Sequence, residues 1–166
     1  MSAAEHLEQA RTHFSAGRFA AAMDSARLAL AEEPENLEAM LFCGRILRRS
    51  GNHEPAVKLY EAILDHQPAS AEARAGIGAC HGALGRSSAA ETELRQAVEL
   101  KPDYFEAWSF LAEALIEQGK TLEAMDCFER SLAIRPYNPV ALSKFLFHTV
   151  FDPRYDAERI SALNRD

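Results

Sequence analysis

The feature that most constrains this chain is a period of 34 residues that runs through most of its 166 positions. Three columns of identical residues carry the period, and they contain Gly17, Gly51, Gly85 and Gly119; Ala22, Ala56, Ala90 and Ala124; and Pro34, Pro68, Pro102 and Pro136. Half of the 8 glycines and four of the 7 prolines lie in these columns. A fixed period of about 20–50 residues is typical of repeat architectures, in which each unit packs only against its neighbours.

Each column has a physical role in a helical unit. Glycine adopts a left-handed backbone at little cost, so the glycine column fits the position just after a helix. The alanine lies midway through the next helix, where a small side chain lets two antiparallel helices cross closely. Proline lacks an N–H and clashes with the preceding turn, so the proline column ends that second helix. Each unit is therefore helix, tight turn, helix and proline stop.

The spacing predicts an all-α chain with no strands. The expected helix pairs are 3–16 with 19–32, 37–50 with 53–66, 71–84 with 87–100, and 105–118 with 121–134. These pairs form four units over 1–138, namely 3–36, 37–70, 71–104 and 105–138. The remainder, 139–166, predicts a capping helix pair at 139–150 and 157–164, which could also link to a downstream domain.

The units resemble tetratricopeptide repeats. The fourth unit carries the fullest match, through Trp108, Leu111, Ala112, Leu115, Gly119, Ala124, Phe128 and Pro136. The resemblance implies a right-handed superhelical solenoid of four repeats plus C-terminal capping helices. It also implies that the first helix of each pair lines a concave face, which these solenoids use to bind ligands.

The segment from Phe145 to Arg165 is similar to a bridging segment in bacterial proteins that place such repeats ahead of a SPINDLY-type, O-GlcNAc-transferase-like glycosyltransferase. The resemblance rests on runs such as Phe151-Asp152-Pro153-Arg154-Tyr155. It implies that this chain is the arm of a longer enzyme, with the catalytic residues elsewhere. The alternative is that these residues only cover the open apolar face of the last repeat.

The tetratricopeptide resemblance also implies which side chains face the groove. These are Leu7, Arg11, Phe14, Leu41, Phe42, Arg45, Arg48, Arg49, Glu72, Ala79, Glu106, Phe110, Glu113 and Glu117. They include a basic cluster at Arg45, Arg48 and Arg49, spaced i, i+3 and i+4 on one helix face.

An acidic cluster at Glu106, Glu113 and Glu117 lies two units further on. The unit between the two clusters is rich in small residues, which leaves room for backbone or for a bulky side chain. We therefore expect a groove with a basic end and an acidic end, complementary to an extended peptide of reversed charge order. The alternative is that the arginines are solvated, or pair internally with Glu38 or Glu72.

Two ligand modes known in this family do not fit the residues. Adaptors for chaperone EEVD tails clamp a carboxylate with a lysine, two asparagines, a lysine and an arginine. The matching positions here hold Leu7, Arg11, Phe42, Glu72 and Gly76, so we expect no EEVD-type ligand. O-GlcNAc-transferase superhelices carry an asparagine ladder, whose matching positions here hold Glu8, Phe42, Gly76 and Phe110.

Composition and motifs narrow the function classes. The chain has 25 acidic and 18 basic residues and a formal net charge of −7, which does not favour nucleic-acid binding. It has no run of 18 apolar residues, so we expect no membrane insertion. No glycine-rich phosphate loop, metal-ligand spacing or catalytic motif is present, so we expect no enzyme activity, cofactor or metal. The lack of a leader-like start and three isolated cysteines, Cys43, Cys80 and Cys127, fit a cytoplasmic protein with free, buried thiols.

The leading hypothesis is a protein–protein interaction module that binds an extended segment of a partner in its concave groove. The first alternative is the substrate-recruiting arm of a larger glycosyltransferase. The second is a structural scaffold that self-associates, which would give a concentration-dependent mass in solution.

Overall fold

The computed structural model describes residues 1–149 and contains nine α-helices and no strand within them. The helices are α1 (Ala3–Ser15), α2 (Phe19–Glu32), α3 (Leu37–Arg49), α4 (His53–His66), α5 (Ala71–Ala83), α6 (Ser87–Leu100), α7 (Phe105–Glu117), α8 (Thr121–Ile134) and α9 (Pro139–Thr149). The predicted all-α repeat fold is confirmed. The second helix of each pair has the predicted bounds, and the first ends one residue earlier than predicted because that residue is the C-cap.

The tight turns of the four pairs depend on the glycine column. Its members have φ values of 72°, 82°, 71° and 75°, the left-handed region that side chains disfavour. In the first turn, Gly17 N donates to Phe14 O at 3.0 Å and Arg18 N donates to His13 O at 2.9 Å. This hydrogen-bond pattern is a Schellman motif, and it satisfies the last carbonyls of α1. The same pattern recurs at the other three glycines.

The alanine column lies where the paired helices cross. Ala22, Ala56, Ala90 and Ala124 are all 0% exposed. Larger residues complete three apolar clusters, each of which joins neighbouring helix pairs; among them are Ile46, Ile63, Leu94 and Phe128. The stability of the fold therefore comes from apolar burial between successive helices.

The cysteines behave as small core residues. Cys43, Cys80 and Cys127 are free and buried, as predicted. Burial raises the pKa of Cys80 and of Cys127 to about 11. Both thiols are therefore protonated and poor nucleophiles at neutral pH.

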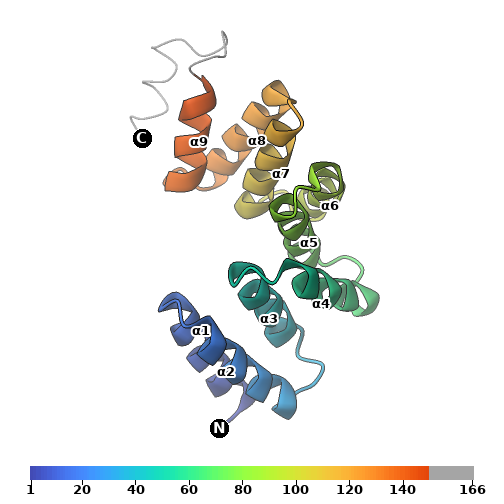
Figure 1. Cartoon of the computed structure of the whole chain (residues 1–166), viewed down its shortest axis with the longest axis vertical. Helices are drawn as coiled ribbons and strands as arrows, with labels where there is room; N and C mark the ends of the chain where they lie inside the picture. The colour runs from blue at the N-terminus through green and yellow to red at the C-terminus, as the bar shows by residue number, and fades with distance from the viewer. Residues whose placement is uncertain (150–166) are drawn as a thin grey trace.

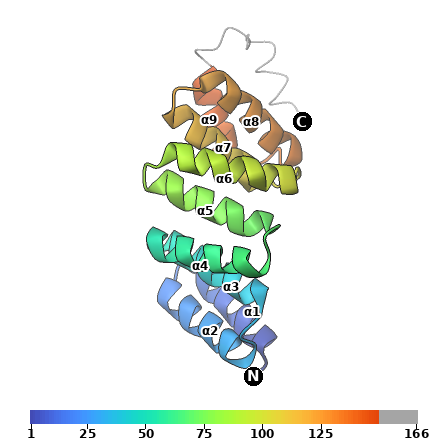
Figure 2. The same ribbon diagram turned by 90° about the vertical axis from the view of Figure 1, so that its right-hand side faces the viewer.

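The helix pairs follow one another along a curve (Figure 1). Seen from the side, they form a column from α1 and α2 at one end to α8 and α9 at the other (Figure 2). The first helices of successive pairs contact one another, α3 with α5 and α5 with α7. These three helices form the inner, concave side.

Side-chain caps start two of the three inner helices. Asn36 Oδ1 accepts a hydrogen bond from Ala39 N at 3.0 Å, and Ser70 Oγ accepts one from Ala73 N at 3.2 Å. Such caps satisfy amide groups that the first turn of a helix leaves free. They determine where α3 and α5 begin, and hence which of their residues face the groove.

The C-terminal part of the described chain is α9, which packs against α8 and buries Ala141 and Phe145. The predicted helix 157–164 and most of the SPINDLY-like segment lie outside the described residues. Within 1–149, no helix combines the length and apolar character needed to cross a membrane. Over the same range, no group of three or more His, Cys, Asp or Glu residues could hold a metal ion.

Candidate functional site

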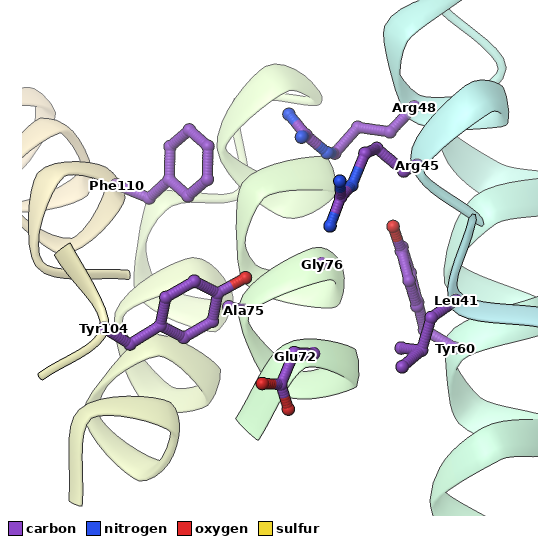
Figure 3. A pocket seen from close by; sticks show the side chains of 9 residues that line it. All are labelled: Leu41, Arg45, Arg48, Tyr60, Glu72, Ala75, Gly76, Tyr104 and Phe110. Carbon is purple, nitrogen blue, oxygen red and sulfur yellow. The ribbon is translucent and has the colours of Figure 1, made fainter. Parts of the chain in front are cut away.

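A small hollow of about 50 Å³ opens on the concave side between α3, α5 and α7. We call it the central pocket. Its lining residues are Leu41, Arg45, Arg48, Tyr60, Glu72, Ala75, Gly76, Tyr104 and Phe110, and Figure 3 shows how they lie. The pocket brings together predicted groove residues from the second, third and fourth units, and adds two tyrosines that sequence reasoning missed.

Two glycines let Tyr60 reach the central pocket. Tyr60 comes from α4, on the outer layer, and its ring passes between α3 and α5. A Cβ atom placed on Gly44 would lie 2.6 Å from Tyr60 Cζ, and one on Gly76 would lie 2.4 Å from the same atom. No real side chain tolerates such distances, so the ring position requires glycine at both places. The sequence predicted open space beside the small residues of the third unit. At Gly76 the Tyr60 ring occupies that space.

The Tyr60 phenol is a neutral hydrogen-bond donor. The residue is 3% exposed. Burial raises the pKa of Tyr60 to about 12, although the Arg48 guanidinium favours the phenolate. The hydroxyl points toward Arg45 (Figure 3). At neutral pH it therefore keeps its proton beside the two arginines.

Arg45 and Arg48 stack on aromatic rings and have no carboxylate partner. The guanidinium carbon of Arg45 lies 5.9 Å from the centre of the Phe42 ring, and that of Arg48 lies 5.2 Å from the centre of the Phe110 ring. Neither forms an ion pair with any carboxylate of residues 1–149. Cation–π stacking holds each guanidinium in place without neutralising its charge. Arg49 is exposed and lies outside the central pocket.

Glu72, at the other side of the pocket, does have a partner. Lys101 Nζ donates to Glu72 Oε1 at 2.8 Å. Burial works against ionisation of Glu72, yet the hydrogen bond from Lys101 lowers the pKa of this carboxyl below its ordinary value. Lys101 also lies 5.2 Å from the centre of the Tyr104 ring. The alternative of an internal ion pair between the arginines and Glu72 is not observed, because Glu72 pairs with Lys101, although the nearby charge of Arg45 also favours the ionised carboxylate.

The predicted groove residues of the first unit lie apart from the central pocket. Leu7 is 4% exposed and packs in the core, because its helix face meets α2 and α3. The Phe14 ring contacts those of Phe19 and Phe42, each at 5.5 Å between centres, and Phe42 is 8% exposed. Arg11 pairs with Glu8 and Glu38. These residues pack the first unit against the second.

The predicted acidic cluster lies beyond the pocket, toward α9. Glu113 pairs with Lys144 Nζ of α9 at 2.6 Å. Glu117 accepts a hydrogen bond from the Ser87 hydroxyl. Glu106 is partly buried at the start of α7. Ala79, which is also partly buried, continues the small-residue surface of α5 past Gly76.

The pocket residues that sequence reasoning missed are Tyr60 and Tyr104. Tyr60 occupies the same repeat column as Ala26, Leu94 and Phe128, which predicts only a core position. The signal that could have found it is a polar aromatic residue in an apolar column, next to a unit rich in glycine.

Comparisons with known proteins agree with this architecture. The family model described as "Tetratricopeptide repeat" matches residues 13–80, 47–114 and 83–143. Human tetratricopeptide repeat protein 7A is 34% identical over 107 residues, which are 64% of this chain and 12% of that protein. The chain thus spans about an eighth of this curated relative.

Solved structures with a similar fold support the same helical repeat architecture. TTC0263, a thermophilic protein of Thermus thermophilus, superposes with a TM-score of 0.82 at 19% identity, over 99% of this chain and 93% of that one. An O-GlcNAc transferase of Thermobaculum terrenum superposes with a TM-score of 0.69 at 25% identity, over 76% of this chain and 24% of that one.

A third solved structure, the first tetratricopeptide repeat domain of Spaghetti (RPAP3) bound to the HSP90 peptide SRMEEVD, has a TM-score of 0.65 at 21% identity and covers 70% of this chain and 93% of that one. Its likeness to this chain concerns the fold alone. The family model covers most of the chain, and the glycine turns and buried alanines recur at its period. The chain therefore belongs to the tetratricopeptide repeat family.

Proposed function

We propose that this chain is a protein–protein interaction module that binds an extended acidic segment of a partner protein along α3, α5 and α7. The observation that carries the proposal is the pair Arg45 and Arg48, which lie at the central pocket without a carboxylate partner in residues 1–149. Arg11, Arg74, Arg86 and Arg95 each form an ion pair. Among the arginines of residues 1–149 that form none, Arg45 and Arg48 are the two that line the central pocket. Two positive charges held ready at a concave site favour an anionic ligand.

The surroundings of the arginines suit a peptide. Leu41 and Phe110 offer apolar contacts beside the charges. Beyond Gly76, α5 carries the small, partly exposed residues Ala79 and Gly82, which leave room for a main chain. A mostly apolar lining with a few converging polar groups is typical of binding sites.

Two of the three glutamates predicted at the acidic end, Glu113 and Glu117, already have internal partners. We therefore propose a ligand that is chiefly acidic rather than one with two oppositely charged ends. Ordering such a segment costs about 2–5 kcal/mol, so its affinity should be modest.

A second candidate is the recruiting arm of a glycosyltransferase. It is supported by the similarity to an O-GlcNAc transferase, of which this chain covers 24%. The ladder positions hold Glu8, Phe42, Gly76 and Phe110 instead of asparagine. In this second function the same central pocket would bind acidic acceptor proteins by side-chain charge rather than by an asparagine ladder.

A random peptide library tests the leading proposal. The full chain is immobilised and bound peptides are sequenced, with the double variant Arg45→Glu/Arg48→Glu as the comparison. We expect peptides rich in Asp and Glu to be enriched on the natural chain and lost on the double variant. The matched control is Arg130→Glu, a charge reversal at an exposed residue of α8 outside the pocket. Enrichment of neutral or basic peptides, or of acidic peptides that also bind the double variant, would contradict the proposal.

A further inference from the structure

The charge balance of the central pocket distinguishes between classes of anion. Arg45 and Arg48 contribute two positive charges, and no carboxylate of residues 1–149 pairs with either. Glu72 and Lys101 pair at 2.8 Å and cancel each other. The pocket therefore carries two uncompensated positive charges. A carboxylate would balance one of them, whereas a phosphate monoester carries about −1.5 to −2 at neutral pH.

The number and arrangement of the donor groups also suit a phosphate better than a carboxylate. Each guanidinium presents a planar fork of N–H donors that matches phosphate oxygens. The hydroxyl of Tyr60 points toward Arg45, and that of Tyr104 points toward Gly76, so these groups surround one space above Gly76 (Figure 3). The Glu72 carboxylate lies on the far side of Gly76 from the guanidiniums. A carboxylate has two oxygens, whereas a phosphate monoester has three terminal oxygens for these four donor groups.

These donors are held in position before any ligand arrives. Phe42 and Phe110 support the two guanidiniums at 5.9 and 5.2 Å. Gly44 and Gly76 hold the Tyr60 ring between them. A preorganised set of donors loses little freedom on binding, and its geometry discriminates between ligands.

We infer that the central pocket binds a phosphorylated side chain of the partner segment, with Arg45 and Arg48 as the groups that hold the phosphate. This inference rests on the proposed function and names the modification that the acidic segment carries. Recognition of a phosphate by paired arginines is a general mode of peptide binding. The small residues of α5 give the main chain on either side of the phosphate a surface to lie on.

Oriented peptide libraries test the inference without knowledge of the natural partner. Three libraries share the same mixed flanking positions, and their central residue is phosphoserine, glutamate or serine. We expect the phosphoserine library to bind the full chain at least about tenfold more tightly than the glutamate library, and the serine library to bind most weakly. In Arg48→Gln the preference for phosphoserine over glutamate should fall to less than about threefold, and Arg48→Lys, which keeps the charge but loses the fork, should lie between.

A second experiment compares phosphate and carboxylate as free ions, without a peptide attached. Phosphate and acetate are titrated separately into the full chain, and the amide resonance of Gly76 is followed by NMR. We expect phosphate to shift this resonance at concentrations about tenfold lower than acetate does. Tyr60→Phe, which keeps the ring between the glycines, should weaken the phosphate response severalfold, and Arg130→Gln should not change it. Thermal unfolding of each variant shows that the fold is intact.

The outcomes separate the two proposals. If phosphoserine and glutamate libraries bind equally and both depend on Arg45 and Arg48, the phosphate inference is wrong and the acidic-segment proposal stands. Both proposals are wrong if neither the phosphoserine library nor the glutamate library binds. They are also wrong if substitution of Arg45 and Arg48 leaves the affinity of these libraries unchanged. A phosphate response of Gly76 that persists in Arg48→Gln would also overturn the inference.

Discussion

The two charged clusters of the groove look equivalent in the sequence and differ in the folded chain. Glu113 and Glu117 at one end have partners from neighbouring units, Lys144 and the Ser87 hydroxyl. Arg45 and Arg48 at the other end have aromatic rings beneath them and no carboxylate partner within residues 1–149. A row of like charges on one helix therefore does not reveal whether those charges are available to a ligand. Their availability depends on whether the adjacent unit supplies a partner of opposite charge or a hydrogen-bond donor.

The spacing of the contacts explains the difference. Polar contacts between adjacent units join residues about one repeat apart, such as Arg11 with Glu38 at a separation of 27 and Arg86 with Glu54 at 32. In the next unit, these separations bring Arg48 only to positions 75–80, which hold no charged residue. Arg45 meets Glu72, which Lys101 already holds. The small-residue third unit thus leaves the arginines without a partner.

The largest expected effect comes from reversing the basic end. Arg45→Glu/Arg48→Glu should weaken binding of a selected acidic peptide by about 100-fold or more, equivalent to about 2.7 kcal/mol, because attraction becomes repulsion. Isothermal titration calorimetry measures the change. The matched change at the acidic end, Glu113→Gln/Glu117→Gln, should alter the affinity less than threefold. Equal losses at both ends would show that the two clusters are functionally alike.

Gly76→Ala should damage the base of the pocket through packing rather than charge. The new Cβ would lie 2.4 Å from Tyr60 Cζ, so the ring or α5 must shift. We expect a loss of about 2 kcal/mol in the free energy of unfolding, measured by urea denaturation. Gly82→Ala is the control on the same helix, since its Cβ would meet no atom within 4 Å, and it should be neutral or slightly stabilising. Equal effects of the two substitutions would contradict the role given to Gly76.

Glu91 contrasts with Arg45 and Arg48, because its charge is paired with several neighbouring side chains. Hydrogen bonds from Lys120, Arg95 and Gln118 lower the pKa of Glu91 from its ordinary 4.5 to about 2. Because the folded state lowers this pKa, the stabilisation is complete above about pH 5 and is lost as the pH falls toward 2. We expect Glu91→Gln to lower the unfolding free energy by about 1–2 kcal/mol at pH 7 and by almost nothing near pH 2. Urea denaturation across this range measures it, and a difference independent of pH would refute the assignment.

The smallest effect should come from separating Glu113 from Lys144. Both side chains are partly exposed, at 37% and 43%, and exposed ion pairs contribute less than about 1 kcal/mol. Lys144→Met should therefore lower the melting temperature only slightly, and added salt should reduce the difference. The same substitution frees Glu113 at the acidic end, so affinity for a basic peptide should rise modestly. A large loss of stability would instead assign α9 a structural role through Lys144.

Particular residues show how far the sequence could predict the site. Leu41, Arg45, Arg48, Glu72 and Phe110 were expected on the groove face, and all five line the central pocket. The sequence could place these residues on one side because helix periodicity determines which side chains share a face. Tyr60 could not be placed, because its path between α3 and α5 depends on two glycines in two different helices. The partners of the glutamates were missed for the same reason, since each contact crosses from one unit to the next.

The sequence alone determined the helices, their turns and their order, because glycine, alanine and proline act locally and recur every 34 residues. It also determined that the chain belongs to a repeat family. Only the tertiary structure decided which charges remain available, because charge pairing depends on distances between side chains of different units. It likewise decided that Tyr60, from the outer layer, reaches the inner face. Local rules specify a repeat, whereas the contacts between repeats create the pocket.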